Sequence, residues 1–215
     1  AGPRADGAGP VPDGTDRAAA DPLAGMRAAR ETARRLGDPY ADVTFLITAA
    51  GDGRPEGRAL TLRDVTDRGP GVLINRTSPK WREIEATGRA GLLIYWAAVR
   101  RQYRVRGRVE TMEPAEVSRL WELKSHGARL LENYYGEHHP QSHPVPSRGA
   151  FLEGIERLRR RWPARDAVPR PETLAGIRIV PGEVEAWHGA GEDRLHDRRL
   201  YTRREAGWTM TTLVP

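Results

Sequence analysis

The sequence of 215 residues contains no cysteine. Disulfide bridges, thiolate metal sites and cysteine nucleophiles are therefore excluded. No stretch approaches the roughly 20 consecutive apolar residues that a membrane span requires, and no apolar secretory segment stands near the first residue. We therefore expect a cytoplasmic protein with no membrane partner. With a hydrophobic share of 38% and a charged share of 30%, the composition is typical of a soluble globular chain.

Lysine is nearly absent as well. Lys80 and Lys124 are the only lysines, so arginine carries almost all of the positive charge, and the formal net charge is +6. A basic balance of this kind permits a nucleic acid, an acidic surface or an anionic small ligand as partner. The arginines are scattered among acidic residues, and no recognised nucleic-acid motif is present. We therefore expect no nucleic-acid partner, and DNA binding is the observation that would reverse this expectation.

Residues 1 to about 18 are rich in Ala, Gly, Pro and Asp and have no hydrophobic periodicity. Such a composition predicts a disordered N-terminal arm. The remaining residues, 19–215, contain no internal repeat and no linker long enough to separate two domains. They are therefore predicted to form one domain with a substantial core.

Short turns connect most of the predicted strands of this domain. Alternating apolar and polar residues predict strands, as in 102–110 (QYRVRGRVE), and apolar residues at helical spacing predict helices. The predicted helices are 22–36, 78–86, 114–124, 128–134 and 148–162. The predicted strands are 42–48, 57–63, 71–75, 90–96, 102–110, 176–187, 194–202 and 208–213. This order favours an α+β fold built on an antiparallel β-barrel over a parallel doubly wound sheet.

The segment 75–80 (NRTSPK), which follows the basic strand 58–63 (RALTLR), joins a predicted strand to a predicted helix. Free backbone N–H groups and the helix dipole favour an anion at such a helix start, and Lys80 adds a full positive charge. These features predict a phosphate site. A capped helix with a surface lysine is the alternative, since Ser78 or Thr77 can serve as the cap.

Two further clusters combine aromatic and polar residues. Gln102 follows Trp96 at a strand start, where a glutamine can bond the edge of a heterocycle as donor and acceptor. Farther along, 187–189 (WHG) precedes 194–198 (RLHDR), in which alternate basic side chains would share one face of a strand. Such a face suits an electron-rich anionic partner. A satisfied edge-strand glutamine and an exposed basic strand are the simpler alternatives.

From Asp21 to Pro215, the arrangement of these motifs resembles the pyridoxine/pyridoxamine 5′-phosphate oxidase family. The most specific match is the C-terminal block EAWHGAGEDRLHDRRLYTRREAGWTMTTLVP, with its Trp-x-Gly, Arg-Leu-His-Asp-Arg and terminal Leu-x-Pro. The Asn-x-x-Ser-x-Lys spacing at 75–80 and the VPRP sequence at 168–171 also match. Gln141-Ser142 falls seven residues before Arg148-Gly149, as it does in the family.

The resemblance implies a split β-barrel homodimer with flavin mononucleotide (FMN) bound at the subunit interface. The flavin phosphate would meet Arg58, Ser78 and Lys80. Gln102 would bond polar flavin atoms, as would Gln141 and Ser142 from the partner subunit. The other implied cofactor-binding residues are Ala59, Leu60, Thr61, Leu62, Leu73, Ile74, Trp187 and Arg198.

The implied reaction is hydride transfer from a substrate carbon to flavin N5, followed by reoxidation by dioxygen (O2) with release of hydrogen peroxide (H2O2). Arg194 and His196 are the implied catalytic residues, which would hold the substrate over the flavin ring. Together with Arg63 and Lys124, they would also bind the substrate. The implied substrate is a small anionic aromatic molecule.

Two positions depart from the family's site for the substrate phosphate, which combines a basic residue with a Tyr, an Arg and a Ser. The corresponding residues here are Arg63, Leu120, Lys124 and Ala128, so two hydroxyl groups are lost. In the flavin phosphate loop, Pro79 replaces a second basic residue. The substrate is therefore open between a vitamin B6 phosphate and a carboxylated aromatic ring. Related split-barrel oxidases of phenazine biosynthesis act on the latter kind of molecule.

A non-catalytic flavin- or haem-binding module is a hypothesis from a different class. It would use His138, His139 and His143 as metal or haem ligands. Three prolines are interspersed with these histidines, a composition typical of a polar loop. We therefore expect no metal site.

Overall fold

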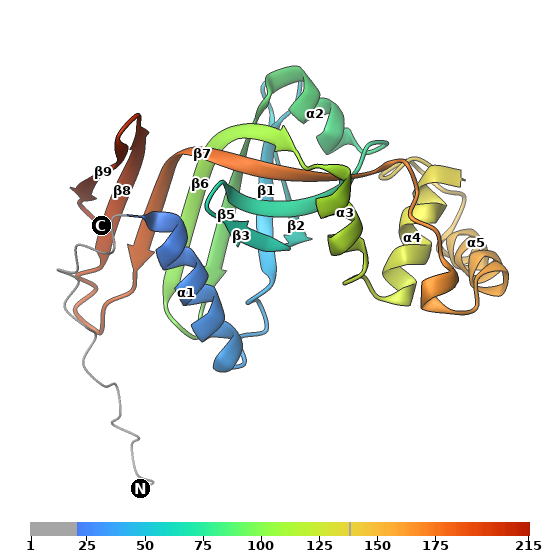
Figure 1. Ribbon diagram of the computed structural model, residues 1–215, viewed down its shortest axis with the longest axis horizontal. Helices are drawn as coiled ribbons and strands as arrows, with labels where there is room; N and C mark the ends of the chain where they lie inside the picture. Colours follow the sequence, from blue (N-terminus) through green and yellow to red (C-terminus); the bar gives the residue numbers. More distant parts are fainter. Residues whose placement is uncertain (1–20, 138) are drawn as a thin grey trace, which may run out of the picture.

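The computed structural model describes residues 21–137 and 139–215; the predicted N-terminal arm lies outside them. Figure 1 shows a curled sheet, with α1 against it and three helices gathered at one end. The helices are α1 (Pro22–Arg35), α2 (Pro79–Thr87), α3 (Pro114–Trp121), α4 (His126–Glu137), α5 (Arg148–Arg161) and the short 3-10 helix η2 (Arg165–Ala167). The strands are β1 (Val43–Ala49), β2 (Pro55–Thr61), β3 (Asp64–Thr66), β4 (Gly69–Asn75), β5 (Arg89–Trp96), β6 (Arg101–Thr111), β7 (Leu174–His188), β8 (Asp197–Arg204) and β9 (Gly207–Leu213).

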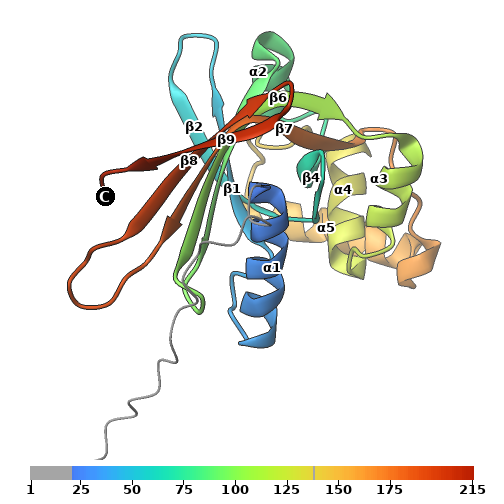
Figure 2. The same cartoon turned by 60° about the vertical axis from the view of Figure 1, so that its left-hand side comes forward.

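All strand pairs in the sheet are antiparallel. The order is β2-β1-β5-β6-β7-β4-β3, and β8 and β9 extend from β7 beside this path. Figure 2 shows how the sheet curls around α1 and how the β8–β9 hairpin projects from it. The predicted antiparallel split β-barrel with peripheral helices is thereby confirmed.

The 15-residue strand β7 connects the two ends of the molecule. Near its start, Gly176 pairs with Leu73 of β4, beside the helical end. Near its end, Trp187 pairs with Gln102 of β6 and with Arg198 of β8. Leu73 and Trp187, which were both predicted for the cofactor site, therefore lie near opposite ends of β7.

The described residues form two apolar cores. The larger one lies between the sheet and α1 and includes Met26, Leu46 and Ile74. The smaller one joins α3, α4 and α5 to the sheet and includes Leu73 and Leu120. Because successive residues of a strand face opposite sides, Leu73 and Ile74 belong to different cores, and the end of β4 lies at the boundary between them.

Pairing of β6 with β7 depends on a glycine. The register shifts between Arg106 and Gly107, as in a β-bulge. A Cβ atom at position 107 would lie 2.0 Å from the carbonyl oxygen of Val180. Only glycine therefore permits this approach of the two backbones.

Most predicted elements agree with the structure to within a few residues at their ends. The short strand β3 and helix η2 were not predicted. The predicted strand 194–202 is wrong at its start, because β8 begins at Asp197. The preceding residues turn instead: Asp193 Oδ1 accepts a hydrogen bond from the Leu195 N–H at 3.1 Å, and Arg194 has a φ of 58°. Aspartate commonly stabilises a turn through such a bond two residues onward.

Candidate active site

A pocket of about 220 Å³ lies at the boundary between the two cores. Residues from β2, β4, α2, α4 and the loop after α4 line it. This pocket brings together nine of the predicted site residues. They are Ala59, Leu60, Thr61, Arg63, Leu73, Ile74, Lys80, Lys124 and Gln141.

Lys80, in the first turn of α2, lines the pocket. Its side chain is buried, and its Nζ donates a hydrogen bond to Gln141 Oε1 at 2.6 Å. Burial, together with the nearby charge of Arg58, lowers the pKa of Lys80 to about 8. An anion bound beside Lys80 would relieve this cost of burial, because an opposite charge favours the protonated form.

Two residues predicted for the same phosphate have other partners. Arg58 donates a hydrogen bond to Thr48 and forms an ion pair with Glu83 at 3.2 Å. Ser78 is fully buried, and its hydroxyl donates to the carbonyl oxygen of Asn75 at 2.6 Å. Ser78 is the residue before α2, yet its side chain does not cap the helix. Neither side chain lines the pocket.

Arg63 is a second lining cation, and its guanidinium group lacks a partner among the described residues. Its Nε atom is buried and donates no hydrogen bond to any acceptor in the part of the chain that the structure describes. Burial lowers the pKa of Arg63, whereas the charges of Glu132 and Asp42 raise it. A buried donor without a partner is costly. Arg63 is therefore the lining residue best suited to receive an anionic ligand.

Helix α4 adds to Ala128 three lining residues that the sequence did not reveal as part of the site. Ala128, Leu131, Glu132 and Tyr135 line the pocket at helical spacing. Glu132 accepts a hydrogen bond from Lys124 Nζ at 2.8 Å, and both side chains are buried. Helical periodicity counted from Lys124 could have placed these residues on one face, but nothing in the sequence shows which face meets the pocket.

Some predicted residues lie close to the pocket without lining it. Leu62 and Leu120 are packed in the two cores and are buried. Ser142 is exposed and follows Gln141 with a φ of 72°. The expectation that Gln141 meets the flavin of the partner subunit stays a prediction. Within its own chain, the loop after α4 lies against the segment before α2, where Thr77 Oγ1 accepts from the Gln141 N–H at 3.1 Å.

A second group of predicted residues lies at the far end of β7. The Trp187 and His196 rings are in contact, with centroids 4.6 Å apart. His196 Nδ1 accepts a hydrogen bond from the Ala190 N–H at 3.0 Å, so its Nε2 is free to face a ligand. Arg198 donates to Glu185 at 2.8 Å, a bond that raises the pKa of Arg198. Arg194 is exposed in the turn before β8.

The two groups lie near opposite ends of β7. Eleven residues separate Gly176, beside the pocket, from Trp187 along β7. At roughly 3.3 Å per residue, that separation is about 36 Å along the strand.

Sequence comparisons agree with this division of the chain. Residues 36–162 match the family described as pyridoxamine 5′-phosphate oxidase, and residues 175–215 match the pyridoxine 5′-phosphate oxidase C-terminal dimerisation region. The chain belongs to the pyridoxamine 5′-phosphate oxidase family. This is an oxidoreductase-type, FMN-binding family, so the resemblance expected from the C-terminal block is confirmed.

Relatives of this oxidase family match the chain over most of its length. A pyridoxine/pyridoxamine 5′-phosphate oxidase of Rubrobacter xylanophilus is 36% identical over 208 residues, which are 97% of this chain and 92% of the relative. The enzyme of the same name from Myxococcus xanthus is 35% identical over 178 residues, which are 83% of this chain and 82% of the relative.

Two solved structures have the same fold. PhzG from Burkholderia lata, crystallised with tetrahydrophenazine-1-carboxylic acid, is 30% identical, with a TM-score of 0.80 over 91% of this chain and 93% of PhzG. An FMN-binding protein of Nostoc punctiforme, related to pyridoxamine 5′-phosphate oxidase, is 23% identical, with a TM-score of 0.71 over 90% of this chain and 98% of that protein.

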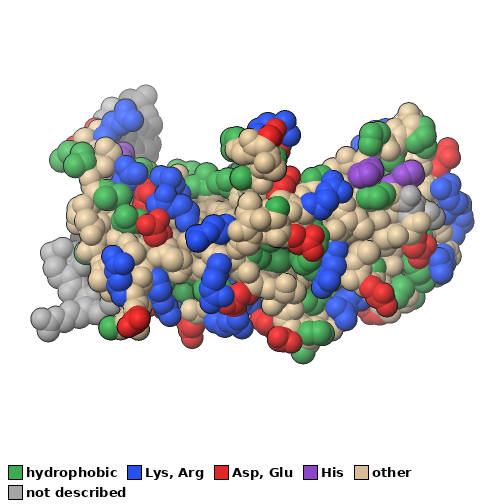
Figure 3. Space-filling model, turned by 90° about the horizontal axis from the view of Figure 1, so that it is seen from above, with side chains coloured by type: hydrophobic (Ala, Val, Ile, Leu, Met, Phe, Trp, Pro, Cys, Tyr) green, Lys and Arg blue, Asp and Glu red, His purple; other side chains and the backbone are tan. Residues whose placement is uncertain are grey.

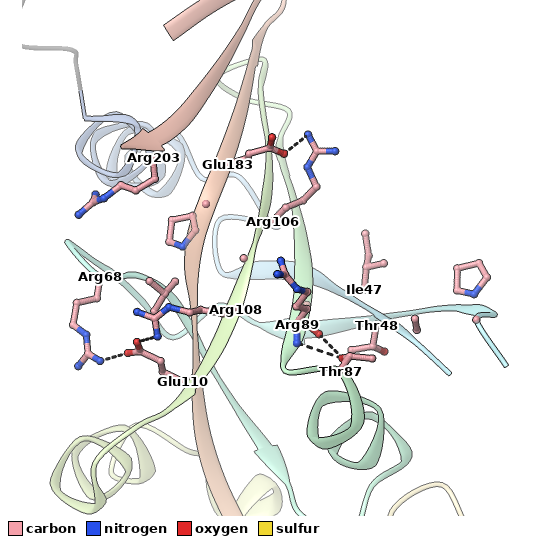
Figure 4. A pocket seen from close by; sticks show the side chains of 18 of the residues that line it. Ile47, Thr48, Arg68, Thr87, Arg89, Arg106, Arg108, Glu110, Glu183 and Arg203 are labelled. Carbon is pink, nitrogen blue, oxygen red and sulfur yellow. Dashed lines mark hydrogen bonds and ion pairs between the residues drawn. The ribbon is translucent and has the colours of Figure 1, made fainter. Parts of the chain in front are cut away.

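A larger pocket of about 1180 Å³ contains none of the predicted site residues of this chain. Figure 4 shows it as a groove lined by arginines, several of them paired with acids: Arg106 with Glu183 at 3.0 Å, and Arg68 and Arg108 with Glu110. Because these charges already have partners and no predicted site residue lies here, we assign the candidate active site to the smaller pocket.

The other hypotheses receive no support from the described residues. No cluster of three or more His, Asp or Glu side chains that could hold a metal ion is found among them; His138 is outside that set, and the His139 ring packs near Tyr134. On the face in Figure 3, basic and acidic side chains are interspersed, with no single basic patch. No helix within 21–137 or 139–215 is long and apolar enough to cross a membrane.

Proposed function

We propose that this protein is an FMN-dependent oxidase of the pyridoxamine 5′-phosphate oxidase type, acting on a small anionic aromatic substrate. The observation that carries the proposal is the pocket itself. It is lined by Lys80, which is buried, and by Arg63, whose buried Nε atom has no partner among the described residues, two positions that the family resemblance predicts. Two cations suit two anionic groups, one on the cofactor and one on the substrate.

The lining fits FMN. Lys80, with the charge of Arg58 nearby, would hold the phosphate at the start of α2, where the helix dipole also favours an anion. Leu73 and Ile74 of β4, with 59–61 of β2, would contact the apolar ring system. Gln141 would hydrogen-bond polar atoms of the cofactor. When bound, FMN would supply hydride acceptance at N5 and reoxidation by O2 to give H2O2.

A homodimer would complete the site. The pocket in one chain, at about 220 Å³, is smaller than the roughly 300–1,000 Å³ of most ligand sites. The outer face of β1 and β5 exposes Phe45, Ile47 and Tyr95, each more than 40% accessible. Burying these side chains against a second copy would be favourable. In the dimer, the partner would supply Gln102, Trp187 and Arg198 to the flavin.

The same partner would supply the substrate-binding turn before β8. Arg194 would place a positive charge over the ring, which favours the transition state as negative charge builds up on the cofactor. His196, whose Nδ1 is already occupied, would donate from Nε2 to a ring substituent. Arg63 would hold the substrate's anionic group, and Lys124 lines the same pocket. Residues 19–215 would thus form one oxidase domain, for which we expect a cytoplasmic location.

A carboxylated ring is the second candidate substrate, in place of a vitamin B6 phosphate. Ala128 lines the pocket without a hydroxyl, and Leu120 is in the core, so two expected partners of a phosphate are missing. The similarity to PhzG, which was crystallised with a phenazine carboxylic acid, also favours a carboxylated ring as substrate. An oxidase of specialised metabolism would fit this candidate.

The test is direct. Protein purified with added FMN should be yellow and retain the flavin on gel filtration as a dimer. Pyridoxine 5′-phosphate should then be assayed for oxygen consumption and H2O2 release, beside a reduced carboxylated heteroaromatic compound. Absence of bound flavin would refute the proposal, whereas turnover of only one substrate would decide between the two candidates. A haem absorption band would instead support a binding module.

A further inference from the structure

The pocket contains an anion of its own. Glu132 is 9% exposed and Lys124 is 7% exposed, and the Glu132 Oε1 atom accepts from Lys124 Nζ at 2.8 Å. The second oxygen of Glu132 accepts from Asn75 Nδ2 at 3.2 Å. Both carboxylate oxygens therefore have partners, one of which is a lysine predicted to bind the substrate.

This pairing changes the charge available to a substrate. Lys124 and Glu132 together carry no net charge, which leaves Arg63 as a lining cation that has no ion-pair partner among the described residues. Ala128, one helical turn from Glu132, adds no hydrogen bond. A ligand bound at Arg63 would meet one guanidinium group and, near it, the buried carboxylate of Glu132.

Resting on the function proposed above, we propose that Glu132 determines substrate specificity by occupying Lys124. The site would then take a ring with one carboxylate, held by Arg63, and would discriminate against phosphate monoesters. Glu132 is a positioning residue in this proposal, since it acts through Lys124 and through its own charge.

The charges of the two ligand classes explain the discrimination. A phosphate monoester carries about −1.5 to −2 charge at pH 7 and needs several donors. A carboxylate carries one charge, and its two oxygens match the planar fork of a single arginine. Glu132 repels a phosphate more strongly than a carboxylate. It also pairs with Lys124, whose charge would otherwise neutralise part of the phosphate's charge. A phosphate could displace Glu132 from Lys124 only by leaving a buried carboxylate without its cation, which is costly.

Two probes with the same ring system test whether the site prefers a carboxylate or a phosphate monoester. 1-Naphthoate and 1-naphthyl phosphate differ only in the anionic group, and each can be titrated into the FMN-loaded protein while the flavin absorbance is followed. We expect the wild-type protein to bind the carboxylate at least about tenfold more tightly, a difference equal to about one lost charge-assisted contact. Equal affinities, or tighter binding of the phosphate, would overturn the proposal.

The Glu132→Gln variant tests the residue directly. Removing the charge frees Lys124, so the ratio of the two dissociation constants should shift at least about tenfold toward the phosphate. Glu137→Gln is the matched control: Glu137 is on the same helix and pairs with Arg161 at the surface, away from the pocket. A folded Glu132→Gln protein with the wild-type ratio would show that Glu132 has only a structural role.

A third variant covers the case in which Glu132→Gln does not fold. Ala128→Ser adds a hydroxyl to the pocket and leaves the ion pair intact. If Glu132 excludes phosphate, this variant should retain the preference for the carboxylate; reversal of the preference would count against the proposal. Failure of the proposed function gives a different result, because the protein would then bind no FMN and no flavin signal would exist to titrate.

Discussion

Lys80 and Gln141, which are 61 residues apart in the sequence, are joined by a 2.6 Å hydrogen bond from Nζ to Oε1. The bond attaches the loop after α4 to the first turn of α2. It also satisfies one donor of an ammonium group whose pKa burial lowers to about 8. Lys80 therefore loses its proton, and with it its positive charge, slightly above neutral pH.

FMN affinity should consequently depend on pH. The phosphate requires protonated Lys80, and above pH 8 the free protein must take up a proton before the ion pair forms. We expect the dissociation constant for FMN to be nearly constant from pH 7 to 8 and then to rise by up to about tenfold per pH unit. Fluorescence quenching of FMN, measured at constant ionic strength, would record this change.

Lys80→Arg provides the control for this prediction. Arginine stays protonated across the range, so the variant should bind FMN with little change between pH 8 and 10. Lys80→Gln should bind weakly at every pH. A wild-type dissociation constant that stays constant up to pH 10 would show that Lys80 does not contact the phosphate.

Mixed dimers test whether the site is shared between subunits. Lys80→Gln should inactivate the pocket, and Arg194→Ala should inactivate the turn before β8. In a dimer with one subunit of each kind, one of the two sites would combine the intact pocket with the intact turn. We therefore expect the purified mixed dimer to recover about half of the wild-type activity. Activity no higher than the mean of the two parent variants would mean that each subunit uses its own turn.

Gly107 should be essential for stability. In Gly107→Ala, the new methyl group would lie 2.0 Å from the Val180 carbonyl oxygen, and backbone cannot move aside as a flexible side chain can. We expect a loss of about 1–3 kcal/mol in the free energy of unfolding. Urea denaturation at fixed protein concentration would measure it. Gly182→Ala is the control, because nothing lies within 4 Å of its added Cβ, and its stability should stay within about 1 kcal/mol of wild type.

The sequence predicted the sheet well because β6 and its neighbours alternate cleanly. Tyr103 and Val105 are buried, as the period of two requires. The strand prediction failed at 194–196, where the Asp193 side chain stabilises a local turn that strand periodicity cannot reveal. Family motifs predicted nine residues of the pocket. They could not predict Glu132, because its role depends on how α4 packs against β4, a tertiary contact with no sequence signature.

Acid should destabilise the protein through His188. Its ring is partly buried and lies near Arg101, so its pKa is lowered from 6.5 to about 4, while Asp197, 3.6 Å away, offsets this only in part. Below pH 6.5 the unfolded chain binds a proton at this position that the folded chain does not, so stability should fall as the pH decreases from 6.5 to 4. Denaturation midpoints of the wild type and His188→Gln, compared at each pH, isolate this contribution. The variant should lose less stability across that interval, and parallel curves would show that His188 titrates normally in the folded protein.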